Sequence, residues 1–333
     1  MYGVGVIGAG VVGESHARAI HAVDGLQLVA ASRTDAGALD AFVGRHGGVG
    51  YTDYRELLER RDIDCVCIAL PHYLHREAVE LAAQAGKHIL LEKPLGPTIE
   101  ECDQILDSVK THGVKMMLGH TTRFAPAVRR AKELLSEGQV GEVISSWGAA
   151  AKKWESARRR EWHRDRLLGG GMWLTNGVHL IDRMMWLIDR PVESVKGVVA
   201  CRMHDQKADD TAAVFLTFQG GVTSALFAHG YREGAPEQIT ELFCSDGCLR
   251  IDLASGLHVG HRDAWELVPG TESPWAPPAM EAQWEAFRRY LDDEIPNPVS
   301  SEFARGVMAS MFAAERSSAS GREVTLSPPV IAG

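Results

Sequence analysis

Three glycines at short, fixed spacing, Gly8, Gly10 and Gly13, form the first candidate site of this chain. They follow an apolar stretch at residues 3–7 that is typical of a β-strand, and they open a helix-like segment. In such a context the first glycine permits a tight turn, the second lets the backbone approach a pyrophosphate, and the third allows close helix–strand packing. The helix N-terminus adds amide donors. We therefore expect a dinucleotide to bind at Gly8, Gly10, Val11, Val12 and Gly13.

The end of the second expected strand bears on which dinucleotide binds. An NAD site usually places Asp or Glu there for the ribose hydroxyls, whereas this chain has Ser32, Arg33 and Thr34. An arginine flanked by hydroxyls would bind a 2′-phosphate through charge-assisted hydrogen bonds. This pattern favours NADP over NAD. Asp35 comes directly afterwards and could still reach the ribose, so NAD stays open.

Strands and helices that alternate along the chain must position the glycines and residues 32–34. The apolar pattern predicts strands at 4–7, 26–31, 65–70, 88–91 and 115–118, and helices at 10–23, 35–44, 54–59, 75–86 and 99–112. Strands that alternate with helices indicate a parallel sheet covered on both faces. We expect an α/β Rossmann domain over residues 1–121.

The pattern changes after residue 121. Helices are expected at 127–137, 176–188, 279–291 and 301–317, and a run of strands at 192–259. This order predicts an α+β domain over residues 122–333 with a large, mostly antiparallel, open sheet. A long uncovered sheet face would expose apolar surface, so we expect it to be buried in a homodimer or homotetramer.

The bulk composition sets broader limits. The chain has 333 residues, more than one hydrophobic core usually holds. Its formal net charge of −9 disfavours nucleic acid and anionic membranes as partners. The six cysteines lack paired metal-ligand spacing, and no apolar run approaches the roughly 20 residues of a membrane span. We expect a cytoplasmic protein with reduced thiols, no metal site and a small-molecule substrate.

Several further motifs, taken in order, resemble the Gfo/Idh/MocA oxidoreductases, which include glucose–fructose oxidoreductase and inositol dehydrogenases. The resemblance covers nearly the whole chain. Beyond the first glycines, it rests on Glu92-Lys93-Pro94, on Gly169-Gly170-Gly171 leading to His179 and Asp182, on Asp209-Asp210-Thr211, and on the closing Gly321-Arg322-Glu323-Val324. Each motif alone is unspecific, but their order and spacing are not.

The resemblance implies a role for individual residues. Lys93 would sit beside the nicotinamide and the reacting carbon, where it could polarise a carbonyl or transfer a proton. His179 would act as the general acid/base. Leu70, Pro71, His75 and Glu92 would line the nicotinamide end of the cofactor site, and Arg123, Trp162 and Asn176 would contact the substrate alongside Lys93 and His179.

One position departs from the family pattern. The family usually has Asp four residues before the histidine, and this chain has Thr175, followed by Asn176. We assign Thr175 to the catalytic set, with only a hydroxyl to offer; either residue could instead cap the helix. The departure puts the usual sugar-alcohol chemistry in doubt but leaves the cofactor site intact.

The resemblance implies an NAD(P)-dependent dehydrogenase or reductase that acts on the CH–OH groups of a sugar, cyclitol or related polyhydroxylated ring. A basic stretch that includes Lys152, Lys153 and residues 158–160 could attract an anionic substrate, or form a solvated face. Two alternatives are a redox-assisted glycoside hydrolase or lyase that keeps its cofactor bound, and a non-catalytic dinucleotide-binding regulator.

Overall fold

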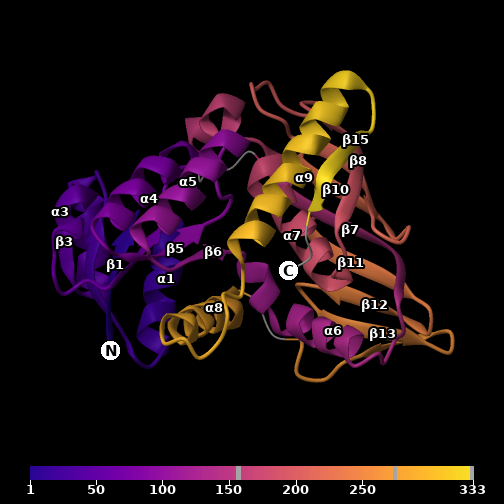
Figure 1. Ribbon diagram of the computed structural model, residues 1–333, viewed down its shortest axis with the longest axis horizontal. Helices are drawn as coiled ribbons and strands as arrows, with labels where there is room; N and C mark the ends of the chain where they lie inside the picture. Colours follow the sequence, from indigo (N-terminus) through magenta and orange to yellow (C-terminus); the bar gives the residue numbers. More distant parts are fainter. Residues whose placement is uncertain (155–158, 273–275, 331–333) are drawn as a thin grey trace. The chain divides into compact units, whose positions relative to one another are not determined.

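The computed structural model describes residues 1–154, 159–272 and 276–330, which form two compact units (Figure 1). Unit 1 comprises Met1–Gly96, Glu100–Thr121 and Pro277–Ser301. Unit 2 comprises Pro97–Ile99, Thr122–Ala276 and Glu302–Gly333. The expected division into residues 1–121 and 122–333 therefore differs from these units, because the segment Pro277–Ser301 groups with the first unit.

Unit 1 is built on a six-stranded parallel sheet with strand order β3-β2-β1-β4-β5-β6. The strands are β1 (Tyr2–Ile7), β2 (Leu26–Ser32), β3 (Val49–Tyr51), β4 (Cys65–Ile68), β5 (His88–Glu92) and β6 (Met116–Gly119). The helices are α1 (Val11–Ala22), α2 (Ala36–His46), α3 (Tyr54–Leu58), η1 (His72–Leu74), α4 (His75–Gln84), α5 (Ile99–His112) and α8 (Ala276–Leu291). The predicted Rossmann fold is confirmed.

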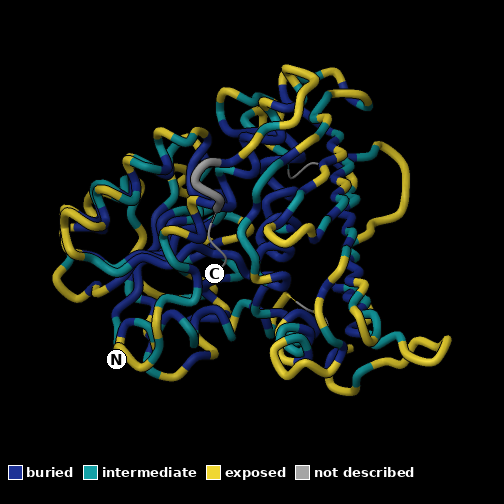
Figure 2. The backbone as a smooth tube through the Cα atoms, turned by 45° about the vertical axis from the view of Figure 1, so that its right-hand side comes forward, coloured by how far each residue is buried: buried dark blue, intermediate teal, exposed yellow. Residues whose placement is uncertain are grey.

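The central strands of this sheet lie inside the unit. Every residue of the central strand β4 is buried, and so is every residue of β6, although β6 lies at an edge of the sheet. Buried residues are drawn in dark blue in Figure 2. Such continuous burial is expected of a parallel sheet with helices on both faces, because neither face meets water. The short edge strand β3 was not predicted, since three residues are too few to show a period.

Helix α8 belongs to unit 1 although it lies far along the chain. Its residues Trp284, Phe287 and Leu291 recur at helical spacing and are buried, whereas Met280 on the same helix is half-buried. Lys115 Nζ donates to the carbonyls of Tyr290 and Leu291 at 2.9 Å each and so holds the helix C-terminus. Figure 1 shows α8 near α1 at the lower edge of the sheet.

Unit 2 contains a nine-stranded mixed sheet with strand order β14-β13-β12-β11-β7-β10-β9-β8-β15. Its strands are β7 (Val143–Lys153), β8 (Val192–Ala200), β9 (Thr211–Phe218), β10 (Thr223–Tyr231), β11 (Glu237–Cys244), β12 (Gly247–Asp252), β13 (Gly256–His261), β14 (Ala264–Leu267) and β15 (Val324–Val330). Only the pairing of β7 with β10 is parallel among those described. The mostly antiparallel sheet is as predicted, but β7 and β15 were not.

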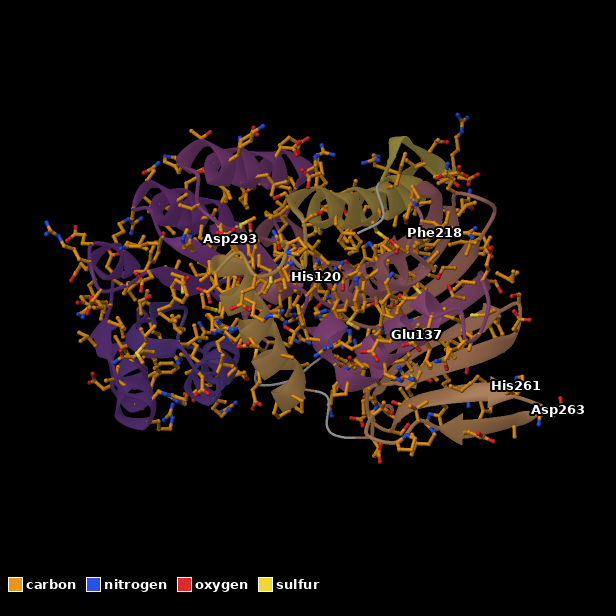
Figure 3. All side chains as sticks on the ribbon, turned by 60° about the horizontal axis from the view of Figure 1, so that its bottom comes forward. His120, Glu137, Phe218, His261, Asp263 and Asp293 are labelled. Atoms are coloured by element: carbon orange, nitrogen blue, oxygen red, sulfur yellow. The ribbon has the colours of Figure 1, made fainter. Side chains whose placement is uncertain are left out.

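Helices lie against one face of this sheet. They are α6 (Pro126–Ser136), α7 (Val178–Ile188) and α9 (Ser301–Ser320), with single turns η2 (Thr121–Phe124), η3 (Glu161–Arg164), η4 (Arg166–Leu168) and the π-helical η5 (Trp173–Gly177). The opposite face carries Val198, Phe215, Phe227 and Phe243, which the strand register places on the same side and which are exposed. Figure 3 labels His261 and Asp263 at the outer tip of the β13–β14 hairpin.

Candidate dinucleotide and substrate sites

In the glycine turn after β1, protein atoms lie close to Gly8 and Gly13 but not to Gly10. Gly8 has φ +103°, and a Cβ on Gly13 would stand 2.4 Å from the Gly8 carbonyl oxygen. A Cβ on Gly10 would meet nothing within 4 Å. Gly8 and Gly13 are therefore required by the turn itself, whereas Gly10 faces open space, as expected where a ligand approaches the backbone.

Helix α1 begins on this open side. Gly10 is its N-cap residue and supplies no side chain to satisfy the first amides. Val11 and Val12 are 64% and 44% exposed, which is unusual for valine unless something covers it. Uncapped amides at a helix start suit a phosphate group, so the predicted residues of this turn fit a dinucleotide pyrophosphate.

The end of β2 places Arg33 at the glycine turn. Its Nη1 donates to the Ala9 carbonyl at 3.0 Å, and the Ser32 carbonyl accepts from the Gly8 and Ala9 amides at 3.1 and 2.9 Å. Asp35 is used elsewhere, because its Oδ1 accepts from the Ala38 amide at 2.9 Å and caps α2. Thr34 is exposed beside them. The end of β2 thus presents the Arg33 guanidinium and the Thr34 hydroxyl, whereas the Asp35 carboxylate caps α2.

A buried histidine joins two loops of unit 1. His75 is fully buried; its Nδ1 lies 2.9 Å from the Pro94 carbonyl oxygen and its Nε2 lies 3.0 Å from that of Leu70. Burial lowers the pKa of His75, although the two carbonyls and the Glu92 carboxylate oppose this. The ring therefore ties the segment after β4, where Leu70 and Pro71 lie, to the segment after β5.

Glu92, at the end of β5, is held by a chain of buried side chains. The indole Nε1–H of Trp284 in α8 donates to His16 Nδ1 at 3.0 Å, and His16 Nε2 lies 3.1 Å from Glu92 Oε1. Because an indole only donates, His16 Nδ1 must accept, so Nε2 carries the proton and donates to Glu92. Burial raises the pKa of Glu92, but this hydrogen bond and the Lys93 charge outweigh it and hold the pKa below its ordinary value.

Lys93 follows Glu92 directly and is half-buried. The peptide bond between Lys93 and Pro94 is cis. Pro94 and Leu95 are buried, so the backbone on both sides of Lys93 is fixed in unit 1. The structure thus places Glu92, Lys93, Leu70 and His75 at one end of neighbouring parallel strands, where ligands of open α/β sheets bind.

In unit 2 the predicted Thr175, Asn176 and His179 lie on one continuous helix. The chain is helical from Met172, runs through the π-helical segment Trp173–Gly177 and continues as α7. Thr175 and Asn176 are 8% and 5% exposed, and His179 is half-buried. Single π-turns often occur at functional sites, and this one shifts Thr175 and Asn176 relative to His179.

Neither Thr175 nor Asn176 caps this helix, because both lie inside it. The start of the helix is held by Asp209, whose Oδ2 accepts from the Trp173 amide at 2.6 Å. Burial raises the pKa of Asp209 to about 7, although the Trp173 amide works against this. A carboxyl group therefore reaches the start of this helix from the loop before β9.

Arg123 occupies the core of unit 2. It is 3% exposed, and its Nε and Nη2 each lie 2.8 Å from Asp182 Oδ1. Its guanidinium also stacks on Phe303, with Cζ 4.0 Å from the ring centroid. The observed partner of Arg123 is thus Asp182, and its contact with substrate stays a prediction.

The basic stretch after β7 contains two aromatic contacts. The rings of Trp162 and His163 stack with centroids 3.7 Å apart, and Arg159 Cζ lies 4.2 Å over the ring of Trp154. Trp162 is half-buried and Trp154 is fully buried. Arg158, part of the predicted basic cluster, lies outside the described residues. The contacts of His16, Trp284 and Asp209, by contrast, join residues too far apart in the sequence for a motif to reveal.

Comparison with known proteins agrees with this geometry. Residues 2–120 match the model of an oxidoreductase family with an NAD-binding Rossmann fold, and residues 128–250 match the GFO/IDH/MocA C-terminal domain. An uncharacterised oxidoreductase from Streptococcus pneumoniae is 31% identical over 75% of this chain and 68% of its own length. The chain belongs to the Gfo/Idh/MocA oxidoreductase family.

Other relatives show the range of named activities. A 2,7-anhydro-N-acetylneuraminate hydratase from Mediterraneibacter gnavus is 26% identical over 98% of this chain and 96% of its own length. A levoglucosan dehydrogenase from Pseudarthrobacter phenanthrenivorans is 32% identical over 66% of this chain and 59% of its own length. The solved structure of a levoglucosan dehydrogenase in complex with NADH has a TM-score of 0.88 at 21% identity, covering 97% of this chain and 98% of that one.

Membership makes this Gfo/Idh/MocA protein an oxidoreductase with an NAD-binding Rossmann unit, from a family that acts on CH–OH groups with NAD(P). Among the described residues, none of the helices has both the length and the apolar character of a membrane span.

Proposed function

We propose that this oxidoreductase is an NADP-preferring dehydrogenase or reductase that acts on a secondary alcohol or carbonyl of a sugar, cyclitol or related ring. The observation that supports this cofactor preference is the arrangement of the charged side chains directly after β2. Arg33 stands at the glycine turn, while Asp35 caps α2. A guanidinium there would bind a 2′-phosphate, whereas the ribose of NAD would lack the usual carboxylate partner.

Fluorescence titration with NADPH and NADH in parallel tests this preference. We expect NADPH to bind at least about tenfold more tightly, and Arg33→Ala to remove the difference. Asp35→Ala is the matched control, which should leave the ratio unchanged because Asp35 serves only the α2 cap. Tighter binding of NADH to the wild type would contradict the proposal.

Separate residues carry the proposed chemistry. The nicotinamide, when bound, supplies the acceptor or donor of the hydride. Lys93, fixed in unit 1 by Glu92 and Pro94, would donate a hydrogen bond to the reacting oxygen of the substrate and polarise it. His179, near the start of α7, would give a proton to that oxygen on reduction and remove it on oxidation, with Thr175 and Asn176 on the same helix contacting substrate hydroxyls.

Substitution of Lys93 tests this assignment. Lys93→Met should lower kcat by about 10²–10⁴-fold, the usual contribution of a positioned acid or base, and leave NADPH binding within about twofold. Lys115→Met, at a lysine that serves only the end of α8, is the control for loss of a lysine in unit 1. Unchanged turnover in Lys93→Met would contradict the catalytic role proposed for this residue.

A second candidate follows from one relative. The hydratase from Mediterraneibacter gnavus matches almost the whole chain, and its name describes addition or loss of water instead of net oxidation. We propose as the alternative a reaction in which the cofactor stays bound and is regenerated in each cycle. Product formation without net change of absorbance at 340 nm would favour this reading over the dehydrogenase.

We also propose that the open face of the unit 2 sheet joins two copies of the chain. Val198, Phe215, Phe227 and Phe243 give this face an apolar row across four strands. An apolar surface of this kind in water is typical of a subunit interface. Light scattering should give the mass of a dimer or tetramer, and Phe215→Glu should reduce it; a monomer mass for the wild type would contradict the interface.

A further inference from the structure

An arginine for which the described part of the chain supplies no acidic partner lies against an aromatic ring in unit 2. Arg159 is half-buried, and its Cζ stands 4.2 Å from the centroid of the Trp154 ring. Burial alone lowers the pKa of this guanidinium; no carboxylate among the described residues counteracts the effect. A partly desolvated cation that the protein leaves without a counter-charge is suited to bind an anion from solution.

The Trp154 ring beneath it is rigidly held. Trp154 is 1% exposed, and its amide donates to the Tyr231 carbonyl at 3.0 Å. Its indole Nε1 donates to Gln206 Oε1 at 2.9 Å. The ring also requires glycine at position 230, where a Cβ would stand 2.8 Å from the Trp154 Cβ. Arg159 therefore rests on a fixed support.

One chain of hydrogen bonds leads from this support to the helix that carries His179. Gln206 Nε2 donates to the Asp209 carbonyl at 3.0 Å. The same carbonyl accepts from the Met172 amide at 3.0 Å, and Met172 begins the helix. Trp154 is thus connected to the helix start through one side chain and one backbone group.

A second chain reaches the same place from the other side of Arg159. The carbonyl of its neighbour Arg160 accepts from the His163 amide at 3.1 Å. The His163 carbonyl in turn accepts from the Gly171 amide at 2.9 Å, one residue before the helix. The first chain, from Trp154, therefore ends at Met172, and the second, from the Arg160 backbone, ends at Gly171. Both end points lie just before the turns that hold Thr175 and His179.

The surrounding charges leave this cation available. Lys153 is paired with Glu233 at 3.5 Å, and Arg164 Nη2 donates to the Asp205 carbonyl at 2.8 Å. The acid that lies on the first connection, Asp209, already accepts from the Trp173 amide. Arg159 is the guanidinium of this stretch that combines partial burial, aromatic support and lack of an ion pair among the described residues.

We propose that Arg159, supported by Trp154, binds a carboxylate of the substrate, so that the enzyme acts on a sugar acid in preference to the corresponding neutral sugar. The planar guanidinium matches the two oxygens of a carboxylate, and the aromatic face fixes its orientation. This inference rests on the proposed function, because it names the substrate class of that reaction.

Matched pairs of compounds test it. We would measure kcat/KM with NADP for glucose and glucuronate, for galactose and galacturonate, and for glucose 6-phosphate. At least one acid should be preferred to its neutral partner by about tenfold or more. Arg159→Gln should lower kcat/KM for that acid by roughly 10- to 100-fold, the effect of losing a charge-assisted contact, and leave the neutral sugar within about twofold.

Arg160→Gln is the matched control, since Arg160 is exposed and uses only its backbone in the contacts above. NADPH titration of every variant reports the cofactor site separately. Equal use of acids and neutral sugars, a preference that survives in Arg159→Gln, or a preference for the phosphate alone would each overturn the carboxylate assignment.

Absence of turnover with every compound, despite NADPH binding, would count against the proposed function. Calorimetric titration of the NADPH complex with glucuronate and galacturonate would then decide the anion site alone. Binding of either acid that is lost in Arg159→Gln and kept in Arg160→Gln supports the site, and no Arg159-dependent binding overturns it.

Discussion

Both units place a helix start beside their predicted site, but they use it in opposite ways. In unit 1 the first amides of α1 follow Gly10 and have no side-chain cap. In unit 2 the Trp173 amide at the corresponding point is already bound by the Asp209 carboxylate. The first arrangement can hold an anionic part of a ligand through backbone amides, and the second cannot. An anion in unit 2 must be held by a side chain, which is the role inferred for Arg159.

The two units also differ in how their interiors hold polar groups. Around the glycine turn of unit 1 the interior contacts are mainly between backbone groups, with close approaches that only glycine allows. Unit 2 buries charged side chains, Arg123 against Asp182 and Arg183 beside them, whose pKa burial lowers to about 10 despite Asp182. Substitutions at the glycine turn of unit 1 should therefore act through packing, and substitutions at the Arg123–Asp182 pair of unit 2 should act through unpaired charge.

The largest expected effect is loss of the buried ion pair in unit 2. Asp182→Ala leaves Arg123 charged, 3% exposed and without that carboxylate, which should cost about 3–5 kcal/mol of unfolding free energy. Urea denaturation measures this loss. Glu133→Gln, which breaks the exposed pair with Arg130, is the control and should cost less than about 1 kcal/mol. Similar values for the two variants would contradict the distinction drawn for unit 2.

The next predicted effect distinguishes Gly13, which packs against the backbone, from Gly10, which faces open space. A methyl group at Gly13 would stand 2.4 Å from a backbone oxygen, so Gly13→Ala should cost about 1–3 kcal/mol of unfolding free energy and abolish cofactor binding. Gly10→Ala meets no protein atom within 4 Å and should change stability by less than about 0.5 kcal/mol.

Cofactor affinity then reports what Gly10 faces. If the dinucleotide approaches the backbone there, Gly10→Ala should weaken NADPH binding by about tenfold or more while the protein stays fully folded. Fluorescence titration and urea denaturation on the same samples provide both readouts. Normal affinity in Gly10→Ala would show that the open side of the turn is not the pyrophosphate side.

The pH dependence of stability should reveal Asp209 in unit 2. Its folded pKa is about 7 because of burial, above the ordinary value near 4 in the unfolded chain. Between these values the folded state keeps a proton that the unfolded state releases, so the contribution is present below about pH 4 and is lost as pH rises towards 7. Asp209→Asn should remove a decline of roughly 2 kcal/mol between pH 5 and 7. Thermal melts of the wild type and of Asp209→Asn across this pH range test the prediction. The same dependence of stability on pH in both proteins would contradict it.

His75 in unit 1 should give the opposite sign. Burial lowers its folded pKa below the unfolded value of about 6.5, so its contribution is present above that value and is lost as pH falls further. His75→Gln should flatten the loss of stability between pH 6.5 and 5. Hydrogen exchange at Leu70 and Lys93 would locate the effect in the two loops that the ring joins, and unaltered acid sensitivity would argue against it.

What the sequence could predict follows the same division. The glycine turn is a local motif whose flanking strand and helix lie within 20 residues, so its pattern and its context could be read together. The start of the helix in unit 2 could not, since Asp209 reaches Trp173 from 36 residues away and the π-turn leaves no mark on the apolar period. Segment 277–301 was assigned to the second domain because order along the chain is no guide to where a late helix packs.

A further prediction tests another connection between residues far apart in the sequence, from Trp284 to Glu92 through His16. Asparagine at position 16 can still accept from the Trp284 indole but cannot reach Glu92. Glutamine can still donate to Glu92 but leaves the indole without its acceptor. Each variant leaves one buried polar group unpaired, at a cost of about 1–3 kcal/mol.

The two variants should nevertheless differ in what they impair. His16→Gln should lower the unfolding free energy while kcat stays within about threefold, because Glu92 remains held beside Lys93. His16→Asn should lower kcat further and shift its pH profile, because Glu92 loses the donor that holds its pKa low. Trp284→Phe should resemble His16→Gln, since it removes the same hydrogen bond from the other end. If both His16 variants lose activity in proportion to stability alone, the chain of contacts is a structural support for unit 1 and does not position the residues beside Lys93.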